Sequence, residues 1–352
     1  MMSTGPRNLK HADQARTEGE EASLISHEYS DLTYKPMSRL GRVFIHTTVL
    51  LCSLANFCYN DMDFDIIRKE ITDPIQENYS FSDESRYSGM NSRELLDLKK
   101  RLLANTGSGV NVYMLDADDG DYEEWDSEAR FGRRFVRRTG SHSVAIASLI
   151  KGRRYSVCPG AKLHFLGHSI DLVETFEKLL EIAETPAVIT ISITMLRDAM
   201  DFKDHFKRAR LRRCITKLVY EKGITIFEAA GNDQSCRSDE ASLIFGIEGV
   251  FHIGSIMMTD DGWMLAPFTD RGPWISYYAQ GIKIETLNST GSHECNRLKE
   301  GTSFSSPLVA CLVARLLSLD PKATPADVKC VLDSLSERRQ LLDENAEGFY
   351  EA

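Results

Sequence analysis

The chain has 352 residues, enough for one large domain or two ordinary ones, and its 42% apolar share is typical of a globular protein. Its formal net charge of -10 argues against general nucleic-acid binding, because phosphate contacts need clustered lysines and arginines. The 8 cysteines include no Cys-x-x-Cys pair, which argues against a zinc site, and their scattered spacing indicates no disulfide framework.

Residues 1–36 are polar and weakly patterned, so we expect them to be disordered. An apolar run at 43–55 follows, but it is too short and too polar for a membrane span, which needs about 20 residues. If translation starts at Met37, the segment 37–55 fits a signal peptide or signal anchor, which implies secretion. Otherwise the run is a buried helix or a disordered stretch, and the expected compartment is the cytoplasm. A membrane anchor stays an open alternative.

Leucines recur with helical spacing at 92–104, where Ser92 is a suitable N-cap. From Gly107 onward, short apolar runs that favour buried strands alternate with helical stretches. The expected strands are 110–115, 163–166, 188–193, 224–230 and 250–256, and the expected helices are 143–150, 172–183 and 202–221. This alternation predicts an α/β fold of three layers, with a mostly parallel central sheet and helices on both faces. It also divides the chain into an N-terminal extension, 1–106, and an organised domain, 107–352.

Polar side chains stand where two of the expected strands end. The first strand ends at Asp116 and the fourth run ends at Asn232, and parallel sheets carry their chemistry at these carboxyl ends. Ser303 precedes an apolar helix, where the helix dipole and free N–H groups favour an oxyanion. His142 opens another helical run. Each residue alone fits a cap, a turn or a structural histidine, but their joint occurrence indicates nucleophilic catalysis.

The order Asp, His, Asn, Ser and the flanking sequences resemble the subtilisin-like serine peptidases, in particular their fungal, proteinase-K-like branch. Residues 142–152 align without a gap with the family's catalytic-histidine helix, usually HGTxVAxxIAG. Gly301-Thr302-Ser303 with Pro307 matches the nucleophile motif and is the most specific match. The other similar segments are 107–116, 158–163, the oxyanion-hole motif 229–232 and the turn 268–273. The resemblance covers roughly 107–335 and implies a subtilisin-like peptidase domain at 107–352.

The resemblance implies a serine endopeptidase. Ser303 would be the nucleophile, His142 its general base and Asp116 the carboxylate that orients the imidazole. Asn232 would donate to the oxyanion together with the backbone N–H of Ser303. The residues implied in substrate binding are Ser192, Ile193, Thr194, Glu228, Ala229, Ala230 and Gly231.

No cofactor is required for such chemistry, and we expect polypeptide substrates, no nucleic acid and a monomer. Asp118 and Asp119 could join a structural calcium site, but we favour a solvated acidic turn. Glu228 stands where the family generally has a small apolar residue. We interpret its carboxylate as a bias toward a basic P1 residue, unless it points away from the pocket, since strand residues alternate faces.

Several segments depart from the family pattern. Ser143-Val144 replaces Gly-Thr after the histidine, and Ala279-Gln280-Gly281 replaces Ala-Pro-Gly. Ser192-Ile193-Thr194 replaces the Ser-x-Gly segment that pairs with substrate backbone, so the Thr194 side chain would obstruct the edge where a peptide adds as a strand. The aspartate motif Asp-[Ser/Thr]-Gly is here Asp116-Ala-Asp118.

These departures leave alternatives open. A catalytically impaired subtilisin fold that works as a binding module is the main one. A second alignment of the histidine segment would put Thr139 where the base belongs, although the match of 142–152 favours His142. A nucleotide-binding α/β protein is disfavoured, because Gly107-Ser108-Gly109 lacks a third glycine, precedes its strand and opens no helix.

Overall fold

The computed structural model describes residues 46–52, 64–69, 85–116, 130–131, 142–152, 155–167, 172–195, 205–236, 242–260, 262–286 and 297–340. The internal contacts divide the chain into units 1–41 and 42–352, and every described element belongs to the second. The expected disorder at 1–36 and the acidic pair Asp118 and Asp119 lie outside the described residues.

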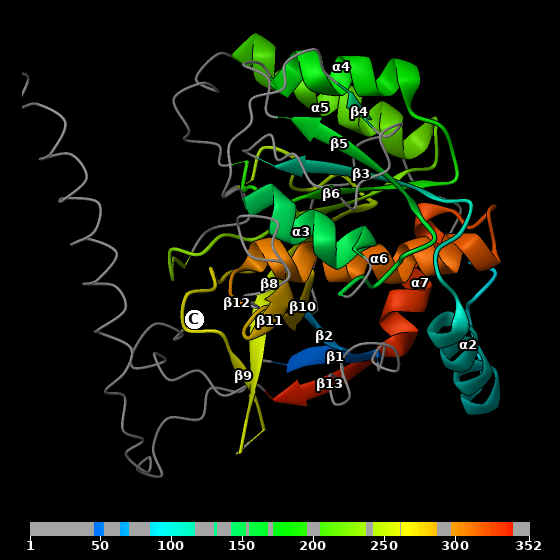
Figure 1. The fold of residues 1–352 in the computed structure, drawn as a ribbon, viewed down its shortest axis with the longest axis vertical. Helices are drawn as coiled ribbons and strands as arrows, with labels where there is room; N and C mark the ends of the chain where they lie inside the picture. Colours follow the sequence, from blue (N-terminus) through cyan, green and yellow to red (C-terminus); the bar gives the residue numbers. More distant parts are fainter. Residues whose placement is uncertain are drawn as a thin grey trace, which may run out of the picture. The chain divides into compact units, whose positions relative to one another are not determined.

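A sheet of 11 strands forms the centre of this unit (Figure 1). In spatial order its strands are β13 (Ser336–Gln340), β1 (His46–Cys52), β2 (Phe64–Lys69), β10 (Tyr277–Gln280), β8 (Val250–Thr259), β7 (Thr225–Ala229), β6 (Ala187–Ile191), β3 (Asn111–Asp116), β5 (Lys162–Gly167) and β4 (Arg130–Phe131). All neighbours from β10 to β4 are parallel, whereas β13, β1 and β2 add antiparallel pairs.

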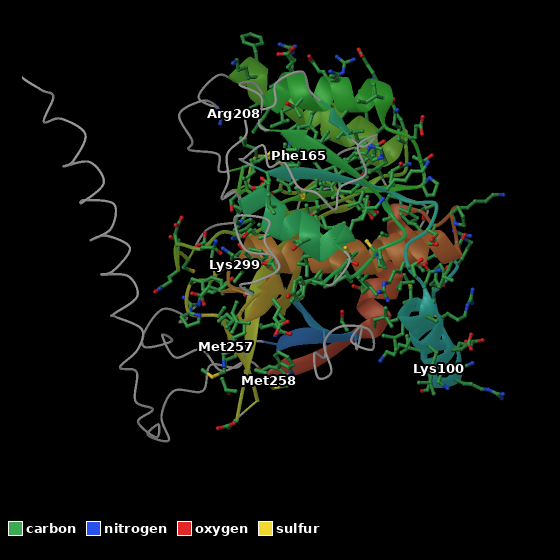
Figure 2. The ribbon with its side chains drawn as sticks, in the orientation of Figure 1. Lys100, Phe165, Arg208, Met257, Met258 and Lys299 are labelled. Carbon is green, nitrogen blue, oxygen red and sulfur yellow. The ribbon has the colours of Figure 1, made fainter. Side chains whose placement is uncertain are left out.

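Two smaller pairings complete the strands. Beyond its pairing with β7, β8 continues as a hairpin with β9 (Gly262–Leu265), and Met257 and Met258 lie on this part (Figure 2). A separate sheet pairs β11 (Ile284–Thr286) with β12 (Arg297–Lys299).

Helices cover both faces of the sheet (Figure 1). One face packs against α3 (His142–Lys151) and α6 (Thr302–Leu319), joined by α2 (Ser92–Ala104) and α7 (Pro325–Leu335), and the other against α4 (Leu172–Ile182) and α5 (His205–Tyr220). β3 illustrates the division, because Val112 and Met114 belong to the first core and Tyr113 and Leu115 to the second. The prediction of a three-layer α/β fold with a mostly parallel sheet is confirmed.

The part of the chain before Gly107 contributes to the same structure. Leu98 and Leu102 of α2 are buried in the core that contains α6, and β2 pairs with β10. Residues on both sides of Gly107 therefore share one core. Within the apolar run 43–55, the described residues His46–Cys52 form a strand and not a helix, which suits their threonines and valine.

The helix at 92–104 has the predicted extent but a different cap. Asn91, not Ser92, is the N-cap, because its side chain accepts from the N–H groups of Arg93 and Glu94. The Glu94 carboxylate in turn accepts from the Asn91 N–H, which completes a capping box.

Among the described helices, α6 alone is long and apolar enough to cross a membrane. Its 18 residues are 89% buried inside the protein, so its apolar character belongs to a core helix.

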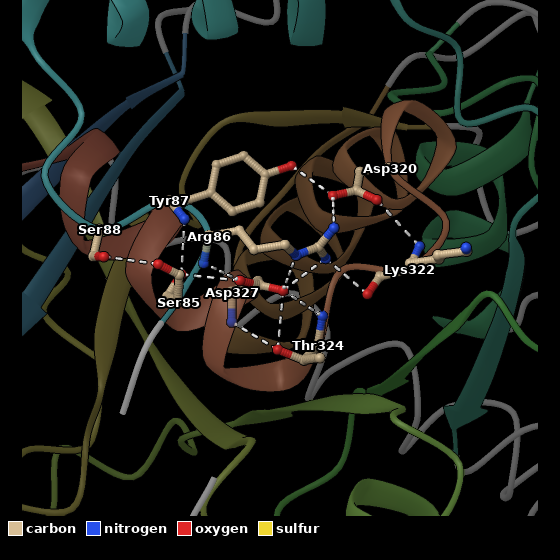
Figure 3. Close-up of polar contacts among 8 residues, drawn as sticks. All are labelled: Ser85, Arg86, Tyr87, Ser88, Asp320, Lys322, Thr324 and Asp327. Carbon is tan, nitrogen blue, oxygen red and sulfur yellow. Dashed lines mark hydrogen bonds and ion pairs between the residues drawn. The ribbon is translucent and has the colours of Figure 1, made fainter. Parts of the chain in front are cut away.

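A polar clasp ties the segment before α2 to the junction between α6 and α7 (Figure 3). We define the clasp as Ser85–Ser88 with Asp320, Lys322, Thr324 and Asp327. The Asp327 carboxylate accepts from the Ser85 hydroxyl, the Arg86 backbone and guanidinium, and the Thr324 backbone and hydroxyl. Burial alone would raise the pKa of Asp327, but the hydrogen bonds from Thr324, Arg86 and Ser85 outweigh it and lower the pKa to about 2.

Acid is expected to open this clasp. Because the folded pKa of Asp327 lies below the ordinary 3.8, the charged carboxylate stabilises the fold fully above that value. As the pH falls from about 4 to about 2, a contribution of about 1–2 kcal/mol is lost. Urea unfolding across this range should therefore show a steeper loss of stability for the wild type than for Asp327→Asn. The control Asp97→Asn, on an exposed position of α2, should keep the wild-type slope, and equal slopes for all three proteins would contradict the argument.

Candidate active site

Three parallel strands end at the same edge of the sheet, and each end carries a residue of interest. Asp116 is the last residue of β3, Ser192 follows β6, and Ala230–Asn232 follow β7. β3 lies between β5 and β6, so the strands that follow it in the sequence lie on both sides of it in the sheet. In parallel sheets, ligand sites usually lie beyond the carboxyl end of a strand in this position. The first turn of α6, with Ser303, meets this edge, because Ser192 Oγ donates to the Ser303 carbonyl at 3.2 Å.

Asp116, His142 and Ser303 form a continuous polar relay. The Nδ1 atom of His142 lies 2.9 Å from Asp116 Oδ2 and 3.1 Å from Oδ1, and its Nε2 atom lies 2.8 Å from Ser303 Oγ. Asp116 is 1% exposed, whereas the His142 side chain is 40% exposed, so the imidazole stands between a buried carboxylate and the surface. Of the two alignments considered for the histidine segment, this geometry fits the one that uses His142.

The chemistry of the partners fixes the hydrogen positions in the relay. An ionised carboxylate only accepts hydrogen bonds, so His142 Nδ1 carries the hydrogen that points at Asp116. In a neutral imidazole the Nε2 atom is then an acceptor, and the Ser303 hydroxyl donates to it. The ring also packs edge-on against Phe304, with 5.4 Å between the ring centroids, which limits its rotation.

Asn232 is oriented by Thr302, the residue before Ser303. The Asn232 Oδ1 atom accepts from the Thr302 N–H and from the Thr302 hydroxyl, both at 2.9 Å. The same hydroxyl accepts from the Gly231 N–H at 3.1 Å. Because two groups donate to this atom, it must be the amide oxygen of Asn232 and not the nitrogen. The NH₂ group therefore points the other way, toward Gly301.

Gly301 leaves an open space between Asn232 and Ser303. A Cβ atom on Gly301 would lie 3.0 Å from Ser303 Oγ and 3.3 Å from Asn232 Nδ2. The φ angle of Gly301 is 139°, which side-chain-bearing residues rarely adopt. Glycine at this position therefore keeps a small cradle free between a hydroxyl and an amide donor.

The segment Ser192-Ile193-Thr194 borders the relay with an unpaired backbone edge. Ser192 N–H donates to the Leu115 carbonyl at 2.9 Å, and the Thr194 hydroxyl donates to the Ala229 carbonyl at 3.1 Å. Within the part of the chain that the structure describes, the backbone N–H and C=O groups of Ile193 and Thr194 make no hydrogen bond. Both residues are partly exposed, so this edge is open to an added strand.

Glu228 occupies a different place from the one that a P1-binding carboxylate would need. It is fully buried on β7, where its Oε1 atom accepts from the Met195 N–H at 2.6 Å and its Oε2 atom accepts from the Ser242 hydroxyl at 2.7 Å. Both oxygens are thus engaged within the chain. The alternative that Glu228 points away from the pocket fits this arrangement better than a direct contact with a basic P1 side chain.

The structure also identifies two supporting residues to which the sequence analysis assigned no role. Thr302 orients the Asn232 amide, as described above. Asp270, inside the turn 268–273, is buried and accepts from the N–H groups of Asp233 and Ser235 at 3.0 and 2.9 Å, while its own N–H donates to the Gly231 carbonyl. Both residues lie in segments whose motifs were recognised, but their partners are distant in the sequence.

The candidate residues thus gather at one edge of the sheet. The relay, Asn232 and the Ser192-Ile193-Thr194 segment surround the first turn of α6, and Ala229, Ala230 and Gly231 line the end of β7 beside them. No group of three metal-binding side chains is found among the residues that the structure describes.

Comparison with known proteins agrees with this architecture. A model of the Subtilase family (Peptidase_S8) matches residues 55–348. Subtilisin-like protease 1 of Pseudogymnoascus destructans is 24% identical over 250 residues, which cover 68% of this chain and 59% of the relative. A subtilisin-like protease of Coccidioides posadasii is 27% identical over 278 residues, which cover 74% of this chain and 63% of the relative. The chain therefore spans about three fifths of the length of these relatives.

The solved structures show the same fold. The crystal structure of a cold-adapted subtilisin-like serine proteinase superposes with a TM-score of 0.53 at 18% identity, over 67% of this chain and 85% of that chain. The family model covers most of the sequence, from β2 to beyond β13, so the similarity is not limited to the individual motifs. The chain belongs to the subtilase family.

Proposed function

We propose that this protein is a serine endopeptidase that hydrolyses peptide bonds with Ser303 as nucleophile. The observation that carries the proposal is the continuous relay from Asp116 through His142 to Ser303, with both imidazole nitrogens within 3.1 Å of their partners. A serine hydroxyl is a weak nucleophile until a neighbouring base takes its proton, and this arrangement supplies the base. Membership of the subtilase family supports the same reaction.

The proposed reaction proceeds in two steps. Ser303 Oγ attacks the peptide carbonyl while its proton passes to His142 Nε2, and Asp116 stabilises the imidazolium without accepting the proton. His142 then protonates the leaving amine as the C–N bond breaks, which leaves an acyl group on Ser303. The same imidazole then takes a proton from a water molecule while the water oxygen attacks the acyl carbon. The bond from this carbon to Ser303 Oγ breaks, the imidazolium returns the proton to Ser303 Oγ, and the carboxylic acid product leaves.

The cradle beside Gly301 is the proposed oxyanion site. A tetrahedral intermediate on Ser303 carries its negative oxygen within reach of a nearby donor, and the Asn232 NH₂ group faces the space that a Gly301 Cβ would fill. The backbone N–H groups at the start of α6 add the positive end of the helix dipole. Ile193 and Thr194 offer backbone groups that make no hydrogen bond among the described residues, which supports binding of an extended polypeptide substrate by strand addition.

Covalent labelling tests the proposal directly. A fluorophosphonate should react with the wild type at Ser303, because an activated hydroxyl displaces its fluoride, and Ser303→Ala should remove the label completely. His142→Ala is expected to lower peptide hydrolysis by about 10⁴-fold or more, and Asn232→Ala by about 10²–10³-fold. Mass spectrometry of the labelled peptide and hydrolysis of a quenched peptide library are the measurements. A folded wild-type protein that neither reacts nor cleaves would contradict the proposal.

The oxyanion cradle predicts a second result. Gly301→Ala would place a methyl group between Asn232 Nδ2 and Ser303 Oγ, so labelling and hydrolysis should both fall by about 10²-fold or more. Gly109→Ala is the matched control, because Gly109 has a φ of 83° and nothing within 4 Å of the added Cβ. It imposes a similar backbone strain without blocking the cradle, and its kinetics should equal those of the wild type. Similar losses in both variants would contradict the assignment.

The position of the Thr194 side chain leads to a prediction about the P1 residue, the substrate residue that donates the carbonyl of the cleaved bond. Its hydroxyl reaches the Ala229 carbonyl and lies 3.3 Å from where a Gly231 Cβ would stand, so its side chain bridges the two segments beside Ser303. Small P1 residues should therefore be preferred. In Thr194→Gly, kcat/KM for a P1 phenylalanine relative to P1 alanine should rise about 10-fold, because the bridge is removed. Thr194→Ser keeps the hydroxyl and should keep the wild-type ratio. An unchanged ratio in both variants would refute the prediction.

A further inference from the structure

The carboxyl group of Glu228 lies buried directly behind the edge formed by residues 192–195. Glu228 is 0% exposed, and its two carboxylate oxygens accept short hydrogen bonds from the Met195 N–H and the Ser242 hydroxyl. His252, itself 2% exposed, brings its Nδ1 atom within 2.9 Å of Oε2, although the contact is not aligned as a hydrogen bond. A carboxylate buried this deeply is tolerated only because its partners compensate for lost hydration.

The position of Met195 gives these contacts a functional meaning. Met195 directly follows Thr194, so the carboxylate holds the end of the backbone edge at which a substrate would pair. The beginning of that edge is held by Ser192, whose hydroxyl donates to the carbonyl of Ser303 at 3.2 Å. Between these anchors, the backbone groups of Ile193 and Thr194 make no hydrogen bond with any residue that the structure describes. One end of the edge is therefore held by the helix that carries Ser303, and the other end is held by Glu228 and by the Leu243 N–H, which donates to the Met195 carbonyl at 2.9 Å.

Glu228 also links this edge to the oxyanion segment. It is the residue before Ala229, and Ala229 accepts a hydrogen bond from the Thr194 hydroxyl at 3.1 Å. β7 and the segment 192–195 are thus joined twice, by the Thr194 hydroxyl and by the Glu228 carboxylate. A shift of the edge relative to Asn232 would break both bonds, so the two sides of the site keep a fixed separation.

We propose that Glu228 is a positioning residue that sets the place of the substrate-pairing edge by holding the Met195 N–H. The inference rests on the proposed function, since it assigns Glu228 to the binding of the same polypeptide substrate. Glu228 acts through Met195 and does not meet the substrate, because both its oxygens are already engaged. It therefore controls how well an extended peptide pairs and leaves the relay of Asp116, His142 and Ser303 unaffected.

Three variants separate positioning from other roles. Glu228→Val removes the acceptor while keeping an apolar group of the kind that the family generally has here. Glu228→Asp keeps the charge but shortens the side chain by one methylene, which withdraws the carboxylate from Met195. Glu228→Gln keeps an oxygen where Oε1 accepts from Met195, so it serves as the rescuing variant. Ser242→Ala is the matched control, because it removes the bond to Oε2 of the same carboxylate, together with the acceptor for the Ile244 N–H, and leaves the bond to Met195 intact.

Two assays are compared for each variant. Fluorophosphonate labelling reports the relay, since this small probe does not pair with the edge, whereas KM and kcat for an extended quenched peptide that the wild type cleaves report the edge. Glu228→Val and Glu228→Asp should raise KM about 10-fold or more, with kcat and the labelling rate within about 3-fold of the wild type. Glu228→Gln and Ser242→Ala should stay within about 3-fold in every quantity.

The outcomes distinguish this inference from the proposed function. A wild type that neither labels nor cleaves refutes the proposed function, and the inference falls with it. An active wild type whose KM is unchanged in Glu228→Asp refutes the inference alone, even if Glu228→Val does not fold. A labelling rate that falls in parallel with kcat/KM also refutes it, because the carboxylate would then support the whole site and not the edge. Hydrogen exchange at the Met195 amide should be faster in Glu228→Asp than in Glu228→Gln.

Discussion

The carboxyl ends of β3, β6 and β7 meet the first turn of α6 at one edge of the sheet, and the placement of every reacting group depends on this meeting. All residues of α6 from Thr302 to Leu317 are buried, so the helix is enclosed on every side. A shift of one residue along a helix turns its side chains by about 100°, which would carry Ser303 away from His142. Core packing around α6 therefore fixes the position of Ser303 relative to His142 as firmly as the hydrogen bonds within the relay do.

The residues of the relay differ in solvent exposure, and the exposure of each suits its proposed role. The Asp116 carboxylate is nearly inaccessible, so its interaction with the imidazole is little screened by water. The His142 side chain and Asn232 are open to solvent, where a substrate and a leaving amine must reach them. Thr302 connects the two halves, because it holds the Asn232 amide while its neighbour Ser303 faces His142. One turn of helix thus orients both the proposed nucleophile, Ser303, and the proposed oxyanion donor, Asn232.

Local pattern was enough to predict the central strands and helices, because β3, for example, is apolar on both faces as a strand between two helix layers must be. The spacing Asn91-x-x-Glu94 also contains the capping box, but the neighbouring Ser92 is an equally common type of N-cap residue, so the pattern alone does not separate the two. The roles of Glu228 and Asp270 had no such local signal. Met195 lies 33 residues from Glu228, and Asp233 lies 37 residues from Asp270, so only the folded chain identifies these partners. The positions of β1 and β2 had no local signal either, because these strands pair with segments that are distant in the sequence.

The departures from the family pattern at Thr194 and Glu228 belong together physically. Glycine would leave the edge free to adopt several conformations, whereas a β-branched threonine is stiff and adds a hydrogen bond to Ala229. Glu228 adds the second bond, to the next residue, Met195. A rigid edge loses less entropy when a peptide pairs with it, but the same side chain narrows the space beside Ala229. Under the proposed function, the two departures favour tight pairing of peptides that fit and disfavour peptides with a bulky residue beside Ala229.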